Sequence, residues 1–278
     1  MPTIPPVPPP PAAQEPHRLR EVAESFGADA QRYDRTRPSY PELMVHRIVA
    51  ASPGRDFLDV GTGTGIAARQ FRAVGCTVLG VEPDARMADL ARQSGLEVEV
   101  AKFEDWDPAG RSFDAVVAGQ AWHWVDPVAG AAKAAEALRP GGRLAVFWNA
   151  FQLPPEAAES FSEVYLRVLP GSPNFGRAMG AIDPYVIMCA KAADGMRQVG
   201  AFEDAEQWRF EWDRAYTRDE WLDQVPTFGG HNLPPATLQE LTAGIGAAID
   251  ALGGGFIMHY TAMVVSATVT RPDAPASK

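Results

Sequence analysis

The amino-acid sequence predicts an α/β fold with a mostly parallel sheet. Between residues 56 and 150, short apolar runs alternate with segments whose apolar residues recur at helical spacing. Strands joined through helices need crossover connections, which place the strands parallel in one sheet. A second observation is the stretch "FLDVGTGTGIAARQF" at 57–71, in which three glycines spaced two apart connect an apolar run to a helical pattern. Glycines let the backbone approach a ligand closely, so this turn predicts a binding site as well as a fold.

The predicted elements of this core follow one another along the chain. Five strands are expected, at "DFLDV" (56–60), "CTVLGVEP" (76–83), "LEVEVA" (96–101), "FDAVVAG" (113–119) and "GRLAVFWN" (142–149). Helices are expected at 65–75 and 84–95, and each ends at a glycine, which is a typical helix stop. A third, alanine-rich helix is expected at 127–142, ended by its final Pro-Gly-Gly.

Helical patterns also flank this core. Residues 18–52 carry two apolar stripes, one of Leu19, Val22 and Phe26 and the other of Leu43, Val45, Ile48 and Val49. The polar segment "YDRTRPSYP" at 33–41 is expected to connect them. After residue 150, two helical stretches are expected in 151–190, followed by a helix near 191–199.

Two more strands are predicted near the C-terminus, at 205–216 and in the long β-branched run at 256–270. Two capping boxes predict helix starts between them, Thr217 with Glu220 and Thr237 with Glu240.

Composition and charge narrow the classes of function. The net charge of −10 gives no long-range attraction for phosphate backbones, so a nucleic-acid partner is not expected. No apolar run reaches the length of about 18 residues that a membrane span needs. The two cysteines show no metal-type spacing, and no metal site is expected. A reduced, cytoplasmic setting is predicted, because disulfides are rare there.

The glycine turn excludes two common nucleotide sites. A dinucleotide fingerprint needs glycine at its sixth position, where this chain has Ile66, and no Gly-Lys-Ser/Thr of a phosphate loop follows. Glu82 ends the second predicted strand, where a carboxylate can accept hydrogen bonds from ribose hydroxyls. "FEDWD" (103–107) and "AGQAWHW" (118–124) follow or end the next two strands. Ligands of open parallel sheets bind at carboxyl strand ends, so these elements are expected to converge.

Taken together, "LDVGTGTG", "GVEPD", "FDAVVAGQAWHW" and "LRPGGRLAVFWN" resemble the class I S-adenosylmethionine-dependent methyltransferases. The similarity is to the small-molecule branch called type 11 or trans-aconitate-methyltransferase-like, and "QRYDRTRPSYP" fits that branch too. The resemblance implies a Rossmann-like, seven-stranded sheet with an antiparallel last strand, helices on both faces and helical lid insertions. It implies S-adenosyl-L-methionine as the cofactor.

The resemblance also implies a set of cofactor-binding residues, which are Tyr33, Arg37, Asp59, Gly61, Thr62, Gly63, Gly65, Glu82, Pro83, Phe103, Glu104 and Gln120. His123, beside the expected methyl donor, is a candidate general base. Purely structural roles stay open: Phe103 in the core, Tyr33 bonded to a nearby helix, Arg37 as a solvated charge, and His123 packed between tryptophans.

One methyltransferase domain is predicted over 17–270, with a cofactor-binding core at 54–150. Acceptor-side insertions are expected at 151–190 and 213–252, and disordered tails at 1–16 and 271–278. The acceptor side offers Trp148, Phe151, Phe175, Arg177 and Tyr185.

The expected reaction is methyl transfer to an O or N atom, in preference to C, of a small, partly apolar or aromatic molecule. The expected assembly is a monomer or homodimer. Alternatives are methylation of a protein or nucleic acid, or a regulatory protein that binds the cofactor without turnover.

Overall fold

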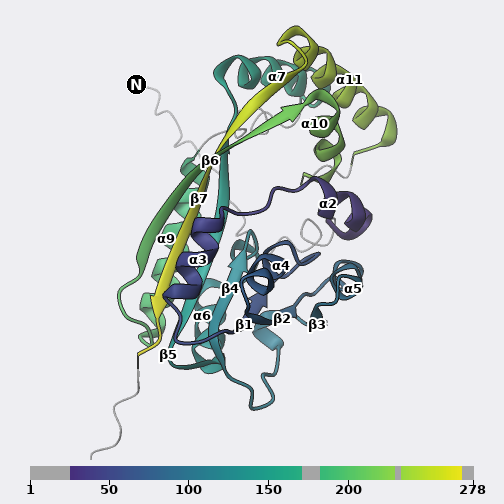
Figure 1. Ribbon diagram of the computed structural model, residues 1–278. Coiled ribbons are helices and arrows are strands. Elements are labelled where there is room, and N and C mark those ends of the chain that lie inside the picture. The colour runs from purple at the N-terminus through teal and green to yellow at the C-terminus, as the bar shows by residue number, and fades with distance from the viewer. Residues whose placement is uncertain (1–25, 171–181, 229–232, 271–278) are drawn as a thin grey trace, which may run out of the picture.

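The computed structural model describes residues 26–170, 182–228 and 233–270 (Figure 1). In these residues seven strands form one sheet, in the order β3-β2-β1-β4-β5-β7-β6. The strands are β1 (Asp56–Val60), β2 (Thr77–Val81), β3 (Glu97–Glu99), β4 (Phe113–Gly119), β5 (Leu138–Gln152), β6 (Glu206–Thr217) and β7 (Gly255–Thr268). β7 runs antiparallel to both β5 and β6, and the other neighbouring pairs are parallel. The predicted mostly parallel sheet with an antiparallel last strand is confirmed.

The central strands are covered on both faces. In the middle of β1, Leu58 pairs with Leu79 of β2 on one side and with Val116 of β4 on the other. All three side chains are buried. A strand buried on both faces needs apolar residues in succession, and for this reason the short apolar runs of the sequence predicted these strands.

Helices pack against both faces of the sheet. One face carries α3 (Glu42–Ala50), α4 (Ile66–Ala73) and α5 (Ala85–Gln93). The other carries α6 (Pro127–Ala137) and α9 (Asp183–Val199). Two short 3₁₀ turns, η3 (Phe103–Asp105) and η4 (Trp122–Trp124), follow β3 and β4.

A cap lies beyond one end of the sheet, where β5, β6 and β7 extend past the shorter strands (Figure 1). The cap consists of α7 (Pro155–Val168), α10 (Arg218–Gln224), η5 (Val225–Thr227), α11 (Pro235–Ala251) and the strand ends they cover. Phe161, Tyr216 and Trp221 are buried at its centre. The cap therefore has an apolar core of its own, separate from the two layers around the sheet.

Two predicted element boundaries are wrong. Pro140-Gly141-Gly142 does not end a helix, because α6 stops at Ala137 and β5 already begins at Leu138. Leu138 pairs with Phe113 of β4, and an irregularity in that ladder accommodates the Pro-Gly-Gly segment inside the strand. Helix α9 begins at Asp183 rather than near 191, with Pro184 in its first turn, where the missing N–H of proline costs nothing.

The N-terminal segment also differs from its prediction. The first part of the expected connection at 33–41 is helical, because α2 (Ala30–Thr36) is capped by Asp29, whose side chain accepts from the Arg32 amide. In α3, Leu43 is 75% exposed and Met44 takes its place in the core. The stripe at Leu19 and Val22 lies outside the described residues, as do the tails at 1–16 and 271–278.

One of the two capping boxes is present. The Thr217 hydroxyl accepts from the Glu220 amide, and the Glu220 carboxylate accepts from the Thr217 amide. The second is wrong, because α11 starts at Pro235 and Thr237 already lies within its first turn. Proline is preorganised for the first helical position, and this local preference moves the start. None of the described helices is long and apolar enough to cross a membrane.

Candidate functional site

The glycine turn joins the end of β1 to α4 and is tied to β2. The amide of Gly61 donates to the Val81 carbonyl, with 2.8 Å between the two atoms. At Gly63 the backbone has φ +56°, and an added Cβ would meet no atom within 4 Å. At Gly65, which begins α4, an added Cβ would lie 2.2 Å from Leu96. Gly65 therefore serves packing, whereas Gly63 presents bare backbone to open space.

Glu82 lies directly after β2 and faces this turn. Its Oε2 accepts from the Gly63 amide at 2.8 Å, and its Oε1 accepts from the Asp84 amide at 3.0 Å. Burial raises the pKa of Glu82 to about 7, against the opposing effect of those two amides. Behind it, burial raises the pKa of Asp59 to about 7, although Asp59 accepts a 2.7 Å hydrogen bond from Thr62. Two carboxyl groups of similar, raised pKa thus lie under the turn.

A cavity of about 660 Å³ opens above these groups and runs toward the cap. That volume is in the range of small-molecule and cofactor sites. Ten of the residues predicted for the site line it, namely Tyr33, Arg37, Gly61, Gly63, Glu82, Pro83, Phe103, Glu104, Gln120 and His123. The other three, Asp59, Thr62 and Gly65, lie behind the wall and do not line it. Their predicted contact with a cofactor stays a prediction.

Two of the lining residues have a structural contact as well. Phe103 is buried against Trp106 and Trp122, with ring centroids 6.2 and 6.1 Å away. Glu104 Oε1 accepts from the Asp126 amide at 3.0 Å, at the start of α6. The core role of Phe103 and its place at the cavity wall therefore coexist.

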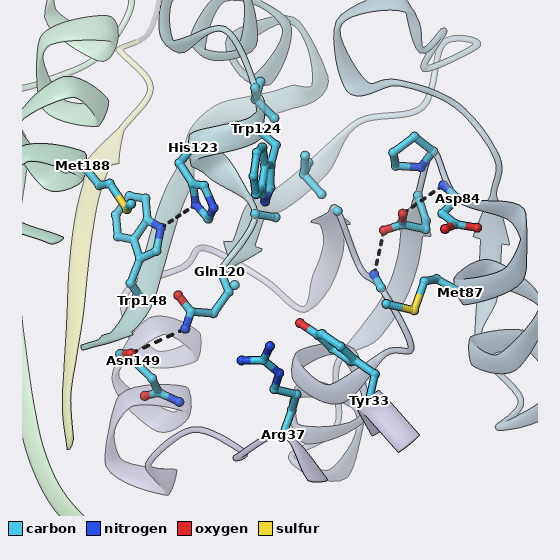
Figure 2. Close-up of a pocket in the computed structure, with 18 of the residues that line it drawn as sticks. Tyr33, Arg37, Asp84, Met87, Gln120, His123, Trp124, Trp148, Asn149 and Met188 are labelled. Atoms are coloured by element: carbon cyan, nitrogen blue, oxygen red, sulfur yellow. Dashed lines mark hydrogen bonds between the residues drawn. The ribbon is translucent and has the colours of Figure 1, made fainter. Parts of the chain in front are cut away.

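The N-terminal helix α2 closes one side of the cavity. The Arg37 guanidinium lies 4.9 Å from the ring centroid of Tyr33 and 4.9 Å from that of Phe228, and it donates to the Thr227 carbonyl. Figure 2 shows Tyr33 and Arg37 facing the cavity opposite Gln120. A cation between two aromatic rings is held in place, so this side of the cavity joins the N-terminal segment to the cap.

Gln120, at the end of β4, has an unusual backbone conformation. Its φ of +55° is rare for a residue other than glycine. Its amide donates to the Phe147 carbonyl at 2.8 Å, and its Nε2 lies 3.5 Å from the Asn149 carbonyl (Figure 2). Strained backbone of this kind concentrates at functional sites.

Several cavity residues were missed by the sequence analysis. They are Asn149 of β5, Met188 of α9, Trp221 and Gln224 of α10, Phe228 directly after η5, and Tyr260 of β7. Asn149 Oδ1 and Gln224 Oε1 are buried without a hydrogen-bond partner in the described part of the chain. The position of Asn149 at the end of a predicted strand was a usable signal. The cap residues gave none, because isolated aromatic and amide side chains in helices are usually core or surface.

Comparisons with known proteins show which family has a similar sequence. The family described as methyltransferase domain matches residues 58–146. An uncharacterized methyltransferase of Mycobacterium tuberculosis is 39% identical over 133 residues, which is 47% of this chain and 54% of that protein. The demethylmenaquinone methyltransferase of Tropheryma whipplei is 30% identical over 163 residues, which is 54% of this chain and 67% of that protein. The chain belongs to the class I S-adenosylmethionine-dependent methyltransferases.

Solved structures agree on the fold. A putative type II methyltransferase from Anaeromyxobacter dehalogenans has a TM-score of 0.59 at 22% identity, covering 85% of this chain and 99% of that one. Phosphoethanolamine N-methyltransferase 2 from Haemonchus contortus, in complex with S-adenosylhomocysteine, has a TM-score of 0.52 at 17% identity, covering 94% and 61%. By sequence, however, the chain spans only about half the length of the mycobacterial relative.

The residues of the cavity fit the cofactor of this methyltransferase family, S-adenosylmethionine. The open space at Gly63 is a cradle that any side chain would fill. Glu82 offers a buried carboxylate at the same wall, and a carboxylate oxygen can accept further hydrogen bonds beside those from the two amides. Within the described ranges, no group of three or more His, Cys, Asp or Glu side chains could hold a metal ion.

Proposed function

We propose that this methyltransferase transfers a methyl group to an O or N atom, in preference to C, of a small, partly apolar or aromatic molecule. The observation that carries the proposal is the continuity of one cavity from Gly63 and Glu82, past Gln120 and His123, to the cap. A cofactor and a second molecule can therefore meet in one cavity.

The cap end of the cavity supports a partly aromatic acceptor. Trp148, Phe151, Tyr185, Phe228 and Tyr260 line it. Aromatic walls bind flat apolar surface and exclude water. Asn149 and Gln224 line the same wall and add polar side chains beside the aromatic rings.

The two halves of the cavity would bind different molecules, one the cofactor and the other the acceptor. When bound, the cofactor supplies a methyl group on a positively charged sulfur. Glu82 would accept from its ribose hydroxyls, and Phe103 and Glu104 would border its base. Tyr33 and Arg37 would close over it from α2, and the cap would hold the acceptor in line with the methyl group. The core at 54–150 would thus bind the cofactor, and the segments at 151–190 and 213–252 would choose the acceptor.

A relative named for demethylmenaquinone supports a small-molecule acceptor for this chain too. The net charge of −10 supports the absence of a nucleic-acid partner, because an acidic protein repels a phosphate backbone at long range.

Calorimetric titration with S-adenosylmethionine and S-adenosylhomocysteine tests the first half of the proposal. We expect micromolar binding to the full chain and a loss of at least tenfold in Glu82→Ala, because hydrogen bonds to a charged group contribute about 1.5–3 kcal/mol. Glu99→Gln is the matched control, since Glu99 ends β3 and pairs with Arg111 outside the cavity. Unchanged affinity in Glu82→Ala would contradict the assigned cofactor site.

Incubation with methyl-labelled S-adenosylmethionine and a panel of small carboxylic acids, phenols and amines tests the second half. Transfer to one class names the acceptor atom. Binding without transfer to any of them would instead favour a regulatory protein that binds the cofactor without turnover.

A further inference from the structure

The His123 ring is held by Trp148 in a way that decides which nitrogen carries its proton. Trp148 Nε1 lies 3.1 Å from His123 Nδ1. An indole N–H is only ever a donor, so Nδ1 must accept and cannot carry a proton. A neutral imidazole then has its one proton on Nε2.

The surroundings keep the ring in this orientation. Trp148 comes from β5 and is fully buried. Trp124 packs on His123 with ring centroids 4.6 Å apart. Figure 2 shows the imidazole between these two tryptophans, at the cavity wall above Gln120. His123 and Trp124 belong to η4, which follows β4, and Trp148 lies in the neighbouring strand β5, so the pairing of these two strands holds the three side chains together.

The second ring nitrogen is available to a ligand. No side chain or backbone group of the described residues bonds to Nε2, and Nε2 is not among the fully buried unpartnered atoms. Since His123 lines the cavity, Nε2 is its accessible polar atom there.

The ring also stays uncharged. Burial lowers the pKa of His123 to about 4, and no nearby carboxylate opposes this effect. A general base needs a free lone pair toward the substrate, but in this tautomer the lone pair is bonded to Trp148. Proton abstraction by His123 would require breaking that bond and turning or re-protonating the ring.

We propose that Trp148 fixes His123 as a hydrogen-bond donor, and that its Nε2–H positions an oxyanion of the methyl acceptor. This inference rests on the proposed function and replaces the expected role of His123 as a base. It makes His123 a residue that selects acceptors entering the cavity already ionised, as carboxylates or phenolates do.

Such an acceptor needs no base. One oxygen lone pair forms the new bond to the methyl carbon while the carbon–sulfur bond breaks, and the negative charge of the acceptor cancels the positive charge of the sulfonium. No proton leaves the acceptor. A carboxylate can bind His123 and attack the methyl carbon at the same time, because one oxygen accepts from His123 while the other attacks.

The tautomer is tested first, by long-range ¹H–¹⁵N correlation spectra of the full chain labelled with ¹⁵N-histidine. His123→Gln identifies the signal by its loss. We expect an Nε2–H tautomer that is unchanged between about pH 8 and pH 6, and in Trp148→Phe a shift toward a mixture of tautomers. An Nδ1–H tautomer, or a ring that becomes protonated near pH 6.5, would overturn the inference. This measurement needs no cofactor, so its outcome does not depend on methyl transfer.

The preference for an anion is tested with 4-nitrophenol, whose absorbance reports its ionisation, in the presence of saturating S-adenosylhomocysteine. The glutamine of His123→Gln keeps an N–H near the place of Nε2, whereas His123→Leu removes it. We expect wild type and His123→Gln to bind the phenolate on the order of tenfold more tightly than His123→Leu does. Equal affinities in all three proteins, or a preference of wild type for the neutral phenol, would overturn the inference. Failure of S-adenosylhomocysteine itself to bind would count against the proposed function and leave the tautomer result standing.

Discussion

Glu82 and Gly63 are joined by a hydrogen bond in which the Gly63 amide donates to Glu82 Oε2 at 2.8 Å. The bond links the turn after β1 to the end of β2, across a cavity wall that both residues line. It brings together the two sequence features that most strongly indicated a bound cofactor. It also places a buried carboxylate beside two backbone amides and near the carboxyl groups of Asp84 and Asp59.

The raised pKa values of Asp59 and Glu82 predict a stability that falls as pH rises. Both groups bind their proton more tightly in the folded chain than in the unfolded one, where a carboxyl titrates near about 4. Unfolding therefore releases protons between about pH 4 and the folded values of about 7. We expect these two groups to lower the unfolding free energy of the ligand-free chain by several kcal/mol across this window, because each unit of pKa shift corresponds to about 1.4 kcal/mol.

Urea unfolding from pH 5 to pH 8 measures this slope, and Glu82→Gln should flatten it. Carboxyl groups with lowered pKa values, such as those of Asp84 and Glu99, titrate below the window. His123, whose pKa burial lowers to about 4, adds a stability that rises with pH within the window, so the difference between wild type and Glu82→Gln isolates the effect of the carboxyl group. A stability that rises over the same range in both proteins would contradict the assigned burial.

Gly63→Ala should separate cofactor binding from folding. The substitution meets no atom within 4 Å, so its cost is the positive φ alone, about 1 kcal/mol. Its methyl group would occupy the cradle, and we expect affinity for S-adenosylhomocysteine to fall at least tenfold by calorimetry, which corresponds to a loss of about 1.4 kcal/mol of binding free energy. Gly110→Ala is the matched control, with φ +77°, no atom within 4 Å and no place in the cavity wall. Equal effects of the two variants on binding would show that Gly63 does not face the cofactor.

The ion pairs between α2 and α10 should control the release of the cofactor. Arg35 bonds to both oxygens of Asp223 at 2.8–3.0 Å, and Arg32 lies 3.2 Å from the same carboxylate. These side chains are partly exposed, so Asp223→Asn should cost less than about 1 kcal/mol of stability. Because α2 carries Tyr33 and Arg37 of the cavity wall, we expect faster dissociation of S-adenosylhomocysteine.

Stopped-flow tryptophan fluorescence measures that rate, which should rise severalfold in the variant and also with salt in wild type, since exposed ion pairs are screened. Asp89→Asn is the control, because Asp89 pairs with Arg92 inside α5. Dissociation at the wild-type rate in Asp223→Asn would show that the ion pairs between α2 and α10 do not control release of the cofactor.

Short sequence motifs predicted a helix boundary correctly where that boundary depends on one helix alone. Glycines at 75 and 95 ended helices as expected, with φ of +89° and +80°. The capping box of Thr217 and Glu220 began α10. Leu43 was misplaced because the helical spacing fits two overlapping stripes, and only packing on the sheet chose Met44. The Pro-Gly-Gly after α6 was misread for a similar reason, since pairing of Leu138 with β4 overrode a helix-stop signal.

The sequence by itself determined the family, the sheet and the residues of the proposed cofactor half of the site. Those features depend on short segments, and parallel strands bring the residues after each strand to the same edge. The tertiary structure alone decided which residues line the proposed acceptor half. Asn149, Gln224 and Tyr260 belong to a strand, a helix and another strand far apart in the chain, and only the packing of the cap turns them toward one cavity. It also decided the state of His123, because the proton position in that ring follows from Trp148, which is 25 residues away on the neighbouring strand β5.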